Sequence, residues 1–340
     1  MYDHAIGSRT DRGRAVLFGA PSHSNVGDQM ILLGELDYLR SIHNEVIIVN
    51  EFEKFRTKDS DTIYFHGGGN FGDLYSPVHL DKIRKLHTFK ANKVIFLPQS
   101  VLFRRQQTII QTREAFASYK GELSLFVREN TSKMIVDNSL GIEAQLLPDS
   151  AILLQPKLKE WVNGIDGKGG LYVRREDAES KQKFNLGLPT SDVMWAGVPL
   201  RPELSVKLVG SLIGARKLII TDRLHAALLA ILIGRHAILL PNSYHKNEAF
   251  YKTWFLPGLS FASTREEIGV LISKGLSDSK KFDTYFGPSK PQNTEEPLSN
   301  DELSRKIDTI STDLQRQFDD IYRSPPIRLY LALKRLLGKL

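Results

Sequence analysis

Residues 15–49 read AVLFGAPSHSNVGDQMILLGELDYLRSIHNEVIIV, and this stretch decides the fold class. It begins with a short apolar run at 15–20 and ends with another at 46–49, each typical of a buried strand. Between them, residues 28–42 have the length and the apolar spacing of an amphipathic helix. A strand, a helix and a second strand in this order predict a βαβ unit, so we expect a largely parallel sheet.

Apolar runs of the same kind continue the pattern along the chain. They predict further strands at 62–66, 93–98, 124–128, 170–174, 217–221 and 236–240, with a helix at 105–120. Pro156 and the following NGIDGKGG (163–170) are typical of an interdomain connection. We therefore expect an α/β protein with two Rossmann-like lobes facing a cleft, an N-terminal lobe at 1–158 and a C-terminal lobe at 169–275.

The last part of the chain has a different composition. Residues 276–324 begin with a polar, proline-containing stretch and continue with a 3.6-residue apolar period, which predicts a connection and a helix packed on the body. Residues 325–340, PPIRLYLALKRLLGKL, place leucines on one face and basic residues on another, which predicts a basic amphipathic helix at an anionic membrane surface. The alternative is that these leucines dock on the protein itself or on a second subunit.

Composition narrows the class of protein. The chain has 340 residues, no cysteine and a net charge of +7. The missing cysteines exclude a disulfide scaffold and a cysteine nucleophile, and they fit a reducing compartment. The N-terminus has no apolar stretch typical of a signal peptide, so we expect a cytoplasmic protein, peripheral on the inner face of a membrane. Four of the seven positive charges lie within 325–340, which leaves a mildly basic body and favours phosphorylated substrates over nucleic acid.

Several known motifs are missing from the sequence. There is no G-x-x-x-x-G-K-[ST] and no G-x-S-x-G, so neither a P-loop nucleotidase nor an α/β-hydrolase has support. No ligand spacing of the H-E-x-x-H kind is present either. We therefore expect no metal ion and no cofactor.

The first cluster that could carry chemistry is SNVGD, residues 24–28, between the opening strand and its helix. Gly27 permits a tight turn, and Asp28 can cap the helix. The alternative is that Asp28 points into the cleft, where a carboxylate could orient or deprotonate a sugar hydroxyl.

The second cluster is HGGGNFGD, residues 66–73, directly after a strand. Its glycines satisfy G-x-G-x-x-G, but the next strand ends in LPQS without the acid that a ribose would need, which argues against a dinucleotide. Consecutive glycines let a ligand approach the backbone closely. We expect His66 to line the cleft without acting as a catalyst.

The third cluster is TDRLHAALLAILIG, residues 221–234. The helix is apolar all round and so should be buried, with Gly234 at its end. Arg223 and His225 lie at its start, where the helix dipole disfavours cations unless an anion docks there. A guanidinium, an imidazole and free backbone N–H groups make a phosphate or carboxylate site. The alternative is a structural ion pair between Arg223 and an acid elsewhere.

Two further basic positions follow predicted strands. Arg174 and Arg175 lie at the end of the strand predicted for 170–174, and either of them could face the cleft, while Lys246 lies in the loop after 236–240. The alternative is that these basic residues are solvated surface charges. Ligands of open α/β sheets bind at such strand ends. VREN (127–130) and LPDS (147–150) are also strand exits, to which the spacing assigns no role.

Taken in this order, the clusters resemble the polysaccharide pyruvyl transferase family over residues 15–256. Its pattern has an N-x-G-D turn, a G-G-G-N turn, a strand ending in Arg, an R-x-H helix start and an H-K loop. The matching residues are Asn25, Gly27 and Asp28, then Gly67 to Asn70, Arg174, Arg223 with His225, and His245 with Lys246.

The resemblance implies a fold like that of the two-lobed GT-B glycosyltransferases, with phosphoenolpyruvate as donor and a pyruvate ketal on a sugar as product. It implies donor contacts from Arg174, Arg223, Leu224 and His225, to which the strand-end argument adds Lys246. The first half is then left to bind the acceptor, a saccharide or a lipid-linked oligosaccharide of a polysaccharide repeat unit. We expect acceptor contacts from Asn25, Gly27, Asp28, His66, Gly67, Gly68, Gly69 and Asn70.

Ketal formation needs a group that both gives and takes protons near neutrality. His225 fits this role, because an unperturbed imidazole titrates near pH ~6.5, and Asp28 is the candidate base. One alternative is a GT-B glycosyltransferase that uses a nucleotide sugar, because fold alone does not fix function. Another is a non-catalytic protein that binds membrane or nucleic acid through its basic tail.

Overall fold

The computed structural model describes residues 2–6, 13–177, 179–181, 184–194 and 201–275, all of them in one compact unit. The elements predicted for 276–324 and 325–340 lie outside the described residues. No helix of the described part is long and apolar enough to span a membrane.

The first sheet has seven strands within these residues, and all of its strand pairs are parallel. Its order is β2-β1-β3-β5-β6-β7, and β4 pairs with the carboxyl half of β5. The elements of this half are α1 (Tyr2–Ala5), β1 (Arg14–Ala20), α2 (Val26–Ile42), β2 (Glu45–Asn50), β3 (Thr62–Phe65), β4 (Gly68–Gly72), α3 (Ser76–Leu86), β5 (Lys93–Leu102), α4 (Gln106–Ser118), β6 (Leu123–Val127), α5 (Asn130–Leu140) and β7 (Gln145–Leu146).

The second sheet has the order β12-β11-β10-β8-β9, again with parallel pairs. Two helical segments precede it, the 3₁₀ helix η1 (Ser150–Leu154) and α6 (Gln155–Trp161). Its elements are β8 (Gly170–Val173), β9 (Thr190–Ser191), α7 (Pro202–Gly214), β10 (Leu218–Thr221), α8 (Leu224–Leu232), β11 (His236–Leu239), α9 (Lys246–Thr253), β12 (Leu259–Phe261) and α10 (Arg265–Gly275).

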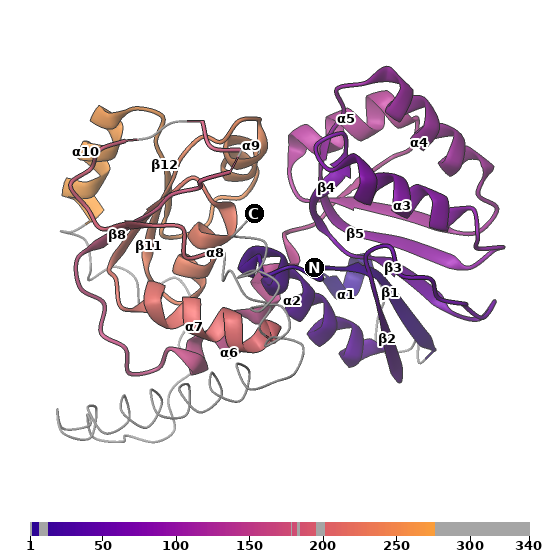
Figure 1. The fold of residues 1–340 in the computed structure, drawn as a ribbon, viewed down its shortest axis with the longest axis horizontal. Coiled ribbons are helices and arrows are strands. Elements are labelled where there is room, and N and C mark those ends of the chain that lie inside the picture. Colours follow the sequence, from indigo (N-terminus) through magenta and orange to yellow (C-terminus); the bar gives the residue numbers. More distant parts are fainter. Residues whose placement is uncertain (1, 7–12, 178, 182–183, 195–200, 276–340) are drawn as a thin grey trace, which may run out of the picture. The chain divides into compact units, whose positions relative to one another are not determined.

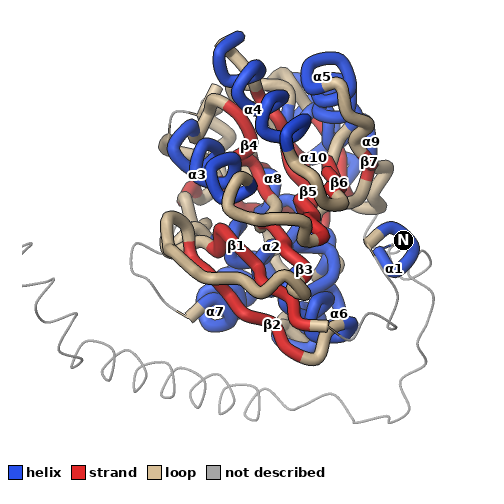
Figure 2. Tube along the Cα trace, turned by 90° about the vertical axis from the view of Figure 1, so that its right-hand side faces the viewer, coloured by secondary structure: helices blue, strands red, loops and turns tan. Residues whose placement is uncertain are grey.

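Helices cover both faces of each sheet, because alternate strand residues point to opposite faces. In β1, Val16 and Phe18 pack with α3, α4 and α5, whereas Ala15 and Leu17 pack with α1 and α2. Helices α3 and α4 lie in front of the strands in Figure 2. In the second sheet, α7 and α8 cover one face and α10 the other (Figure 1).

Helix α2 joins the two halves. It follows β1 in the first sheet, yet Val26, Met30 and Leu33 belong to the apolar core that α7 and α8 form in the second half. The backbone N–H of Val26 also donates to the carbonyl of Met194 at 2.9 Å. The start of α2 therefore lies against residues of both halves.

The structure confirms the predicted α/β class with parallel sheets, and it corrects several details. Helix α2 begins at Val26 and its cap is Asn25, whose side chain accepts from the N–H of Gly27 at 2.9 Å, so Asp28 is not the cap. The glycine-rich stretch is not only a turn, because β4 extends the sheet beside β5. Pro156 lies in the first turn of α6, where a proline fits, and not in a connection. Both sheets fall within the ranges predicted for the two lobes, and the roles of those lobes stay predictions.

Candidate active site

A cavity of about 340 Å³ lies where the carboxyl ends of the two sheets meet the start of α2. In the first sheet, β2 lies on one side of β1 and β3 lies on the other. In the second sheet, β9 lies on one side of β8 and β10 lies on the other, so each sheet has a topological switch point, between β1 and β3 and between β8 and β10. Ligands of open parallel sheets bind outside such switch points. The lining residues are His23, Asn25, Gly27, Asp28, Glu51, Gly69, Asn70, Tyr75, Val78, Arg128, Arg175, Asp177, Glu179, Met194, Arg223, Leu224, His225 and Lys246.

His225 and Gly27 are in close contact across the cavity wall. His225 lies in the first turn of α8 and Gly27 in the first turn of α2. A Cβ atom at Gly27 would lie 2.5 Å from Nδ1 of His225, which is closer than side chains tolerate. Because Gly27 has no side chain, the starts of α2 and α8 can approach each other, and Nδ1 of His225 lies next to the first turn of α2.

The other ring nitrogen of His225 faces a buried carboxylate. Nε2 lies 3.3 Å from Oδ2 of Asp149, and Asp149 also pairs with the buried guanidinium of Arg128. Burial alone would raise the pKa of Asp149, but the charges of His225 and Arg128 outweigh it and hold this pKa well below its usual range. Because an ionised carboxylate only accepts, Nε2 carries a proton, and Nδ1 is the nitrogen left to exchange one.

Arg223 and Arg175 are held by carboxylates of the second half. The guanidinium of Arg223 binds both oxygens of Asp192 and lies 3.3 Å from Asp177. The guanidinium of Arg175 binds Asp177, with its Nε at 2.8 Å, and Glu179 at 2.8 Å. The ion pair considered for Arg223 in the sequence analysis is thus present. These carboxylates offset the positive charges of Arg223 and Arg175 near the start of α8.

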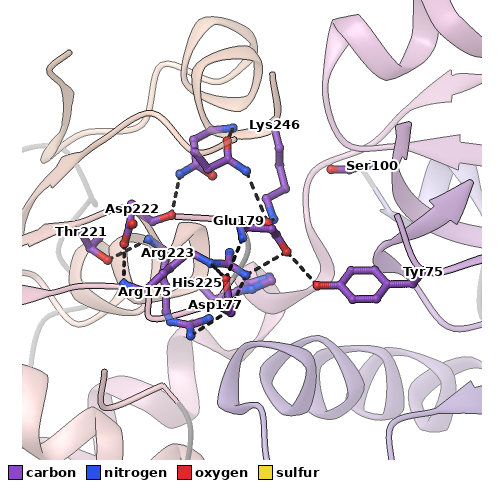
Figure 3. A network of polar contacts seen from close by, with 12 residues as sticks. Tyr75, Ser100, Arg175, Asp177, Glu179, Thr221, Asp222, Arg223, His225 and Lys246 are labelled. Atoms are coloured by element: carbon purple, nitrogen blue, oxygen red, sulfur yellow. Dashed lines mark hydrogen bonds and ion pairs between the residues drawn. The ribbon is translucent and has the colours of Figure 1, made fainter. Parts of the chain in front are cut away.

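Glu179 connects the halves. Its carboxylate accepts from Nζ of Lys246 at 2.8 Å and from the hydroxyl of Tyr75, a residue of the first half, at 2.9 Å (Figure 3). Burial opposes ionisation of Glu179, yet the charges of Lys246 and Arg175 keep its pKa well below the usual range. The carboxylate therefore holds two cations of the cavity in place.

The glycine-rich stretch is fixed from behind by buried polar groups. Glu35 accepts from Nδ1 of His66 at 2.6 Å and from the N–H of Gly67 at 2.8 Å. Nζ of Lys82 donates to the side-chain oxygen of Asn70 at 2.8 Å. Since that oxygen is occupied, Asn70 can present its amide N–H groups to the cavity.

Asp28 lies beside the glycine-rich stretch, with Oδ1 3.8 Å from the position that a Cβ atom would take on Gly68, and other titratable groups surround it. Its carboxylate is 3.6 Å from Nε2 of His23, and Glu51 lines the same wall. Burial raises the pKa of Glu51, and the neighbouring His23 and Lys82 partly offset that rise. This wall therefore offers two carboxylates to a ligand.

The structure brings most of the predicted site residues together. Those that line the cavity are Asn25, Gly27, Asp28, Gly69, Asn70, Arg223, Leu224, His225 and Lys246. Of the two candidate arginines, Arg175 lines it, whereas Arg174 lies 3.7 Å from Glu176 outside it. His66, Gly67 and Gly68 are not among the lining residues. The His66 side chain is turned inward to Glu35, which also accepts from the N–H of Gly67.

Sequence reasoning assigned no role to Arg128 and Asp149, nor to Tyr75, Asp177 and Glu179. Arg128 and Asp149 belong to the strand exits VREN and LPDS, so their place at the carboxyl edge of a parallel sheet was the pattern that could have found them. Tyr75 and Glu179 lie in irregular segments, and only the approach of the two halves gives them a common site.

Comparison with known proteins finds the family that the sequence motifs resemble. The sequence model of a family described as polysaccharide pyruvyl transferase matches residues 25–244. Pyruvyl transferase 1 of Schizosaccharomyces pombe is 28% identical over 71% of this chain and 69% of its own. General stress protein 30 and the putative pyruvyl transferase EpsO, both of Bacillus subtilis, are 26% and 25% identical over 74% and 69% of this chain and 80% and 83% of their own.

A solved structure resembles the fold. The crystal structure of a functionally uncharacterized protein from Klebsiella pneumoniae covers 75% of this chain and 94% of its own, with a TM-score of 0.58 and 22% sequence identity. At this identity the likeness concerns the fold alone.

Proposed function

We propose that this chain, which belongs to the polysaccharide pyruvyl transferase family, moves the pyruvyl group of phosphoenolpyruvate onto two hydroxyls of a sugar in a polysaccharide repeat unit. The observation that carries the proposal is the contact between the start of α2 and the start of α8. It unites Gly27 of the N-x-G-D turn with His225 of the R-x-H helix start in one cavity. The family match favours this transferase over a glycosyltransferase that uses a nucleotide sugar, and we retain a GT-B-like arrangement of the lobes as part of the proposal.

The donor carries a phosphate and a carboxylate, which suit the cationic groups of the cavity. Arg223, Arg175 and Lys246 each have one or more carboxylate partners, which orient them and limit their motion. A guanidinium has five N–H donors, so an ion pair on one edge leaves others for a ligand. The N–H groups at the start of α8 add further donors to an anion.

The reaction can be written so that its protons balance. One proton is added to the methylene carbon of phosphoenolpyruvate while a sugar hydroxyl oxygen bonds to C2. The C2–O bond to phosphate then breaks, and the second hydroxyl bonds to C2. The two hydroxyls release two protons, of which one replaces the proton given to carbon and one leaves with the phosphate.

His225 is the residue that we assign to the proton on carbon. Its Nε2 is engaged by the ionised Asp149, so Nδ1 holds and delivers the proton. Asp28, which also lines the cavity, is our candidate for taking a proton from a sugar hydroxyl. Asn25 and Asn70 line the same cavity and would orient the acceptor.

Phosphate release tests the proposal. Full-length protein would be incubated with phosphoenolpyruvate and the oligosaccharide repeat unit of its own organism, or a lipid-linked form of it. We expect acceptor-dependent release of phosphate and a product heavier by one pyruvyl group, with a ketal methyl resonance by NMR. Tight binding of UDP or GDP without any binding of phosphoenolpyruvate would contradict the proposal, as would release that does not depend on acceptor.

A further inference from the structure

A small space beside Gly69 is surrounded by three hydrogen-bond donors. The position that a Cβ atom would take on this glycine marks where the space lies. That position lies 3.3 Å from Nη2 of Arg128, 3.5 Å from the hydroxyl of Tyr244 and 3.9 Å from Nζ of Lys246. Gly69, Arg128 and Lys246 all line the cavity, so the space opens into it.

Each of the three groups has a donor turned to this space. Arg128 uses Nε to bind Ser100 at 2.8 Å and Nη1 to bind Asp149, and its third nitrogen, Nη2, is the one nearest Gly69. Lys246 gives one proton to Glu179 and has two more. The hydroxyl oxygen of Tyr244 is buried and has no hydrogen-bond partner within the described part of the chain.

Unsatisfied buried hydroxyls are rare and need an explanation. Burial, reinforced by the charge of Glu179, raises the pKa of Tyr244, so this phenol keeps its proton and can donate it. Arginine and lysine have no acceptor atoms. The carboxylates nearby are already engaged. Arg128 and His225 bind Asp149, Lys246 and Arg175 bind Glu179, and the hydroxyls of Ser100 and Ser132 bind Glu129. The space is therefore suited to an acceptor with negative charge.

We propose that the space beside Gly69 is an oxyanion site that receives one anionic group of the donor, with hydrogen bonds from Tyr244, Arg128 and Lys246. The proposal rests on the proposed function for the identity of the ligand, and the chemistry it commits to is a phosphate or a carboxylate oxygen. It gives Gly69 a specific role, because any side chain there would fill the space. It also moves Gly69 from the acceptor contacts expected from the sequence to the donor.

Two substitutions test the site. Gly69→Ala adds only a methyl group, at distances of 3.3 Å or more from its neighbours, and Gly69 is not among the residues with a positive φ. The contact with Arg128 at 3.3 Å is tight, so its guanidinium must shift by a few tenths of an ångström to accommodate the alanine, and the space is then lost. Tyr244→Phe removes only the hydroxyl. Gly269→Ala is the matched control, because it lies in α10 with nothing within 4 Å of its Cβ position.

Isothermal titration with phosphoenolpyruvate, inorganic phosphate and pyruvate gives the measurement. A hydrogen bond to a charged group contributes about 1.5–3 kcal/mol, so each variant should bind phosphoenolpyruvate about ten- to hundredfold more weakly. The control should match the wild type. If the site holds the phosphate, both variants lose affinity for inorganic phosphate and not for pyruvate. If it holds the carboxylate, the reverse is expected.

The outcomes separate this inference from the proposed function. Wild-type affinity for all three ligands in both variants overturns the oxyanion site even if the enzyme forms ketals. A protein that releases no phosphate from phosphoenolpyruvate, yet binds inorganic phosphate or pyruvate in a manner that depends on Tyr244 and Gly69, keeps the site and loses the function. If thermal melting shows Gly69→Ala to be unfolded, the Tyr244→Phe result decides.

Discussion

At the scale of single residues, the proposed chemistry depends on the two nitrogens of His225, which have different neighbours. Nε2 faces Asp149, which holds the imidazole from one side, and Nδ1 lies at the cavity wall beside Gly27, which has no side chain to cover it. A carboxylate that accepts from one nitrogen sets the tautomer and orientation of the ring. In the proposed mechanism, Asp149 is therefore a positioning residue, which acts on the substrate only through His225.

We predict that Asp149→Asn lowers kcat by about 10²- to 10⁴-fold with a smaller change in KM for phosphoenolpyruvate, much as His225→Ala should. The amide can still accept from Arg128 but no longer carries the charge that holds the Nε2 proton. Steady-state kinetics of both single variants and the double variant decide. If the two residues act as a unit, the double variant is no slower than His225→Ala alone, whereas a further loss would show that Asp149 acts independently.

Acid sensitivity can be predicted for His79, a buried residue of α3 away from the cavity. Its Nε2 lies 2.8 Å from the hydroxyl of Thr112, and burial lowers its pKa to about 3. In the unfolded chain this histidine takes up a proton below pH ~6.5, which the folded protein resists, so stability falls as the pH drops from about 6.5 toward 3. The penalty at pH 5 should be about 2 kcal/mol.

Urea unfolding at pH 7 and pH 5 measures this effect. The free energy of unfolding of His79→Gln should fall less between the two pH values than that of the wild type, since glutamine keeps a polar group there and does not titrate. An equal fall in both proteins would assign the acid sensitivity to other groups. Each protein is compared with itself at the two pH values. A loss of stability that the substitution causes by repacking is the same at both values and therefore cancels.

At the scale of elements, α2 determines how the two halves meet. Gly34 lies on the face that packs against η1, and a Cβ atom there would lie 2.1 Å from the carbonyl oxygen of Ser150. The helix can approach η1 only because this residue has no side chain. Packing of α2 on α7 and α8 then places Gly27 against His225.

We predict that Gly34→Ala destabilises the protein by about 1–3 kcal/mol, the usual cost of overpacking, although alanine favours helix formation. Gly210→Ala in α7 is the matched control. Its Cβ position has only ordinary contacts, at 3.7 Å or more, so the control should be neutral or up to about 1 kcal/mol more stable. Chemical denaturation of both variants gives the comparison, and equal stabilities would show that α2 can move away from η1.

At the scale of the whole molecule, our proposals place the acceptor against the first half and the donor against the second half, with Gly69 and Arg128 of the first half also beside the donor. Arg175, Arg223 and Lys246 come from the second half, and Asp28 with His23 comes from the first. We predict that Asp28→Asn impairs pyruvylation while the Kd of phosphoenolpyruvate stays close to that of the wild type. Titration with the donor and turnover with the acceptor separate the two effects. A large loss of donor affinity would place Asp28 in the donor site.

The C-terminal residues 325–340 lie outside the described structure, and their role stays a prediction from sequence. Four basic residues, no acid and a face of leucines predict binding to anionic lipid. Sedimentation with anionic liposomes should be weakened by salt and abolished by deletion of 325–340, while activity on a soluble sugar analogue persists. If the shortened protein unfolds or loses a subunit partner, the leucines belong to a protein interface.

The sequence by itself determined the parallel α/β class, most strands, the buried helix α8 and the family. These features follow from local patterns, because an apolar period or a glycine motif can be recognised within a short stretch of sequence. The RLH helix start and the N-x-G-D turn were likewise recognisable as short motifs, and nine of the predicted site residues line the cavity.

Only the tertiary structure decided which groups share the cavity. Tyr75 and Glu179 are 104 positions apart, and Asp149 and His225 are 76 apart, so no local pattern relates them. The choice of Arg175 over its neighbour depends on the exact exit of β8. The carboxylates that hold Arg223 and Lys246, Asp192 and Glu179, lie 31 and 67 positions away in the sequence. The physical reason is that charges interact through space, and the fold alone sets the distances between them.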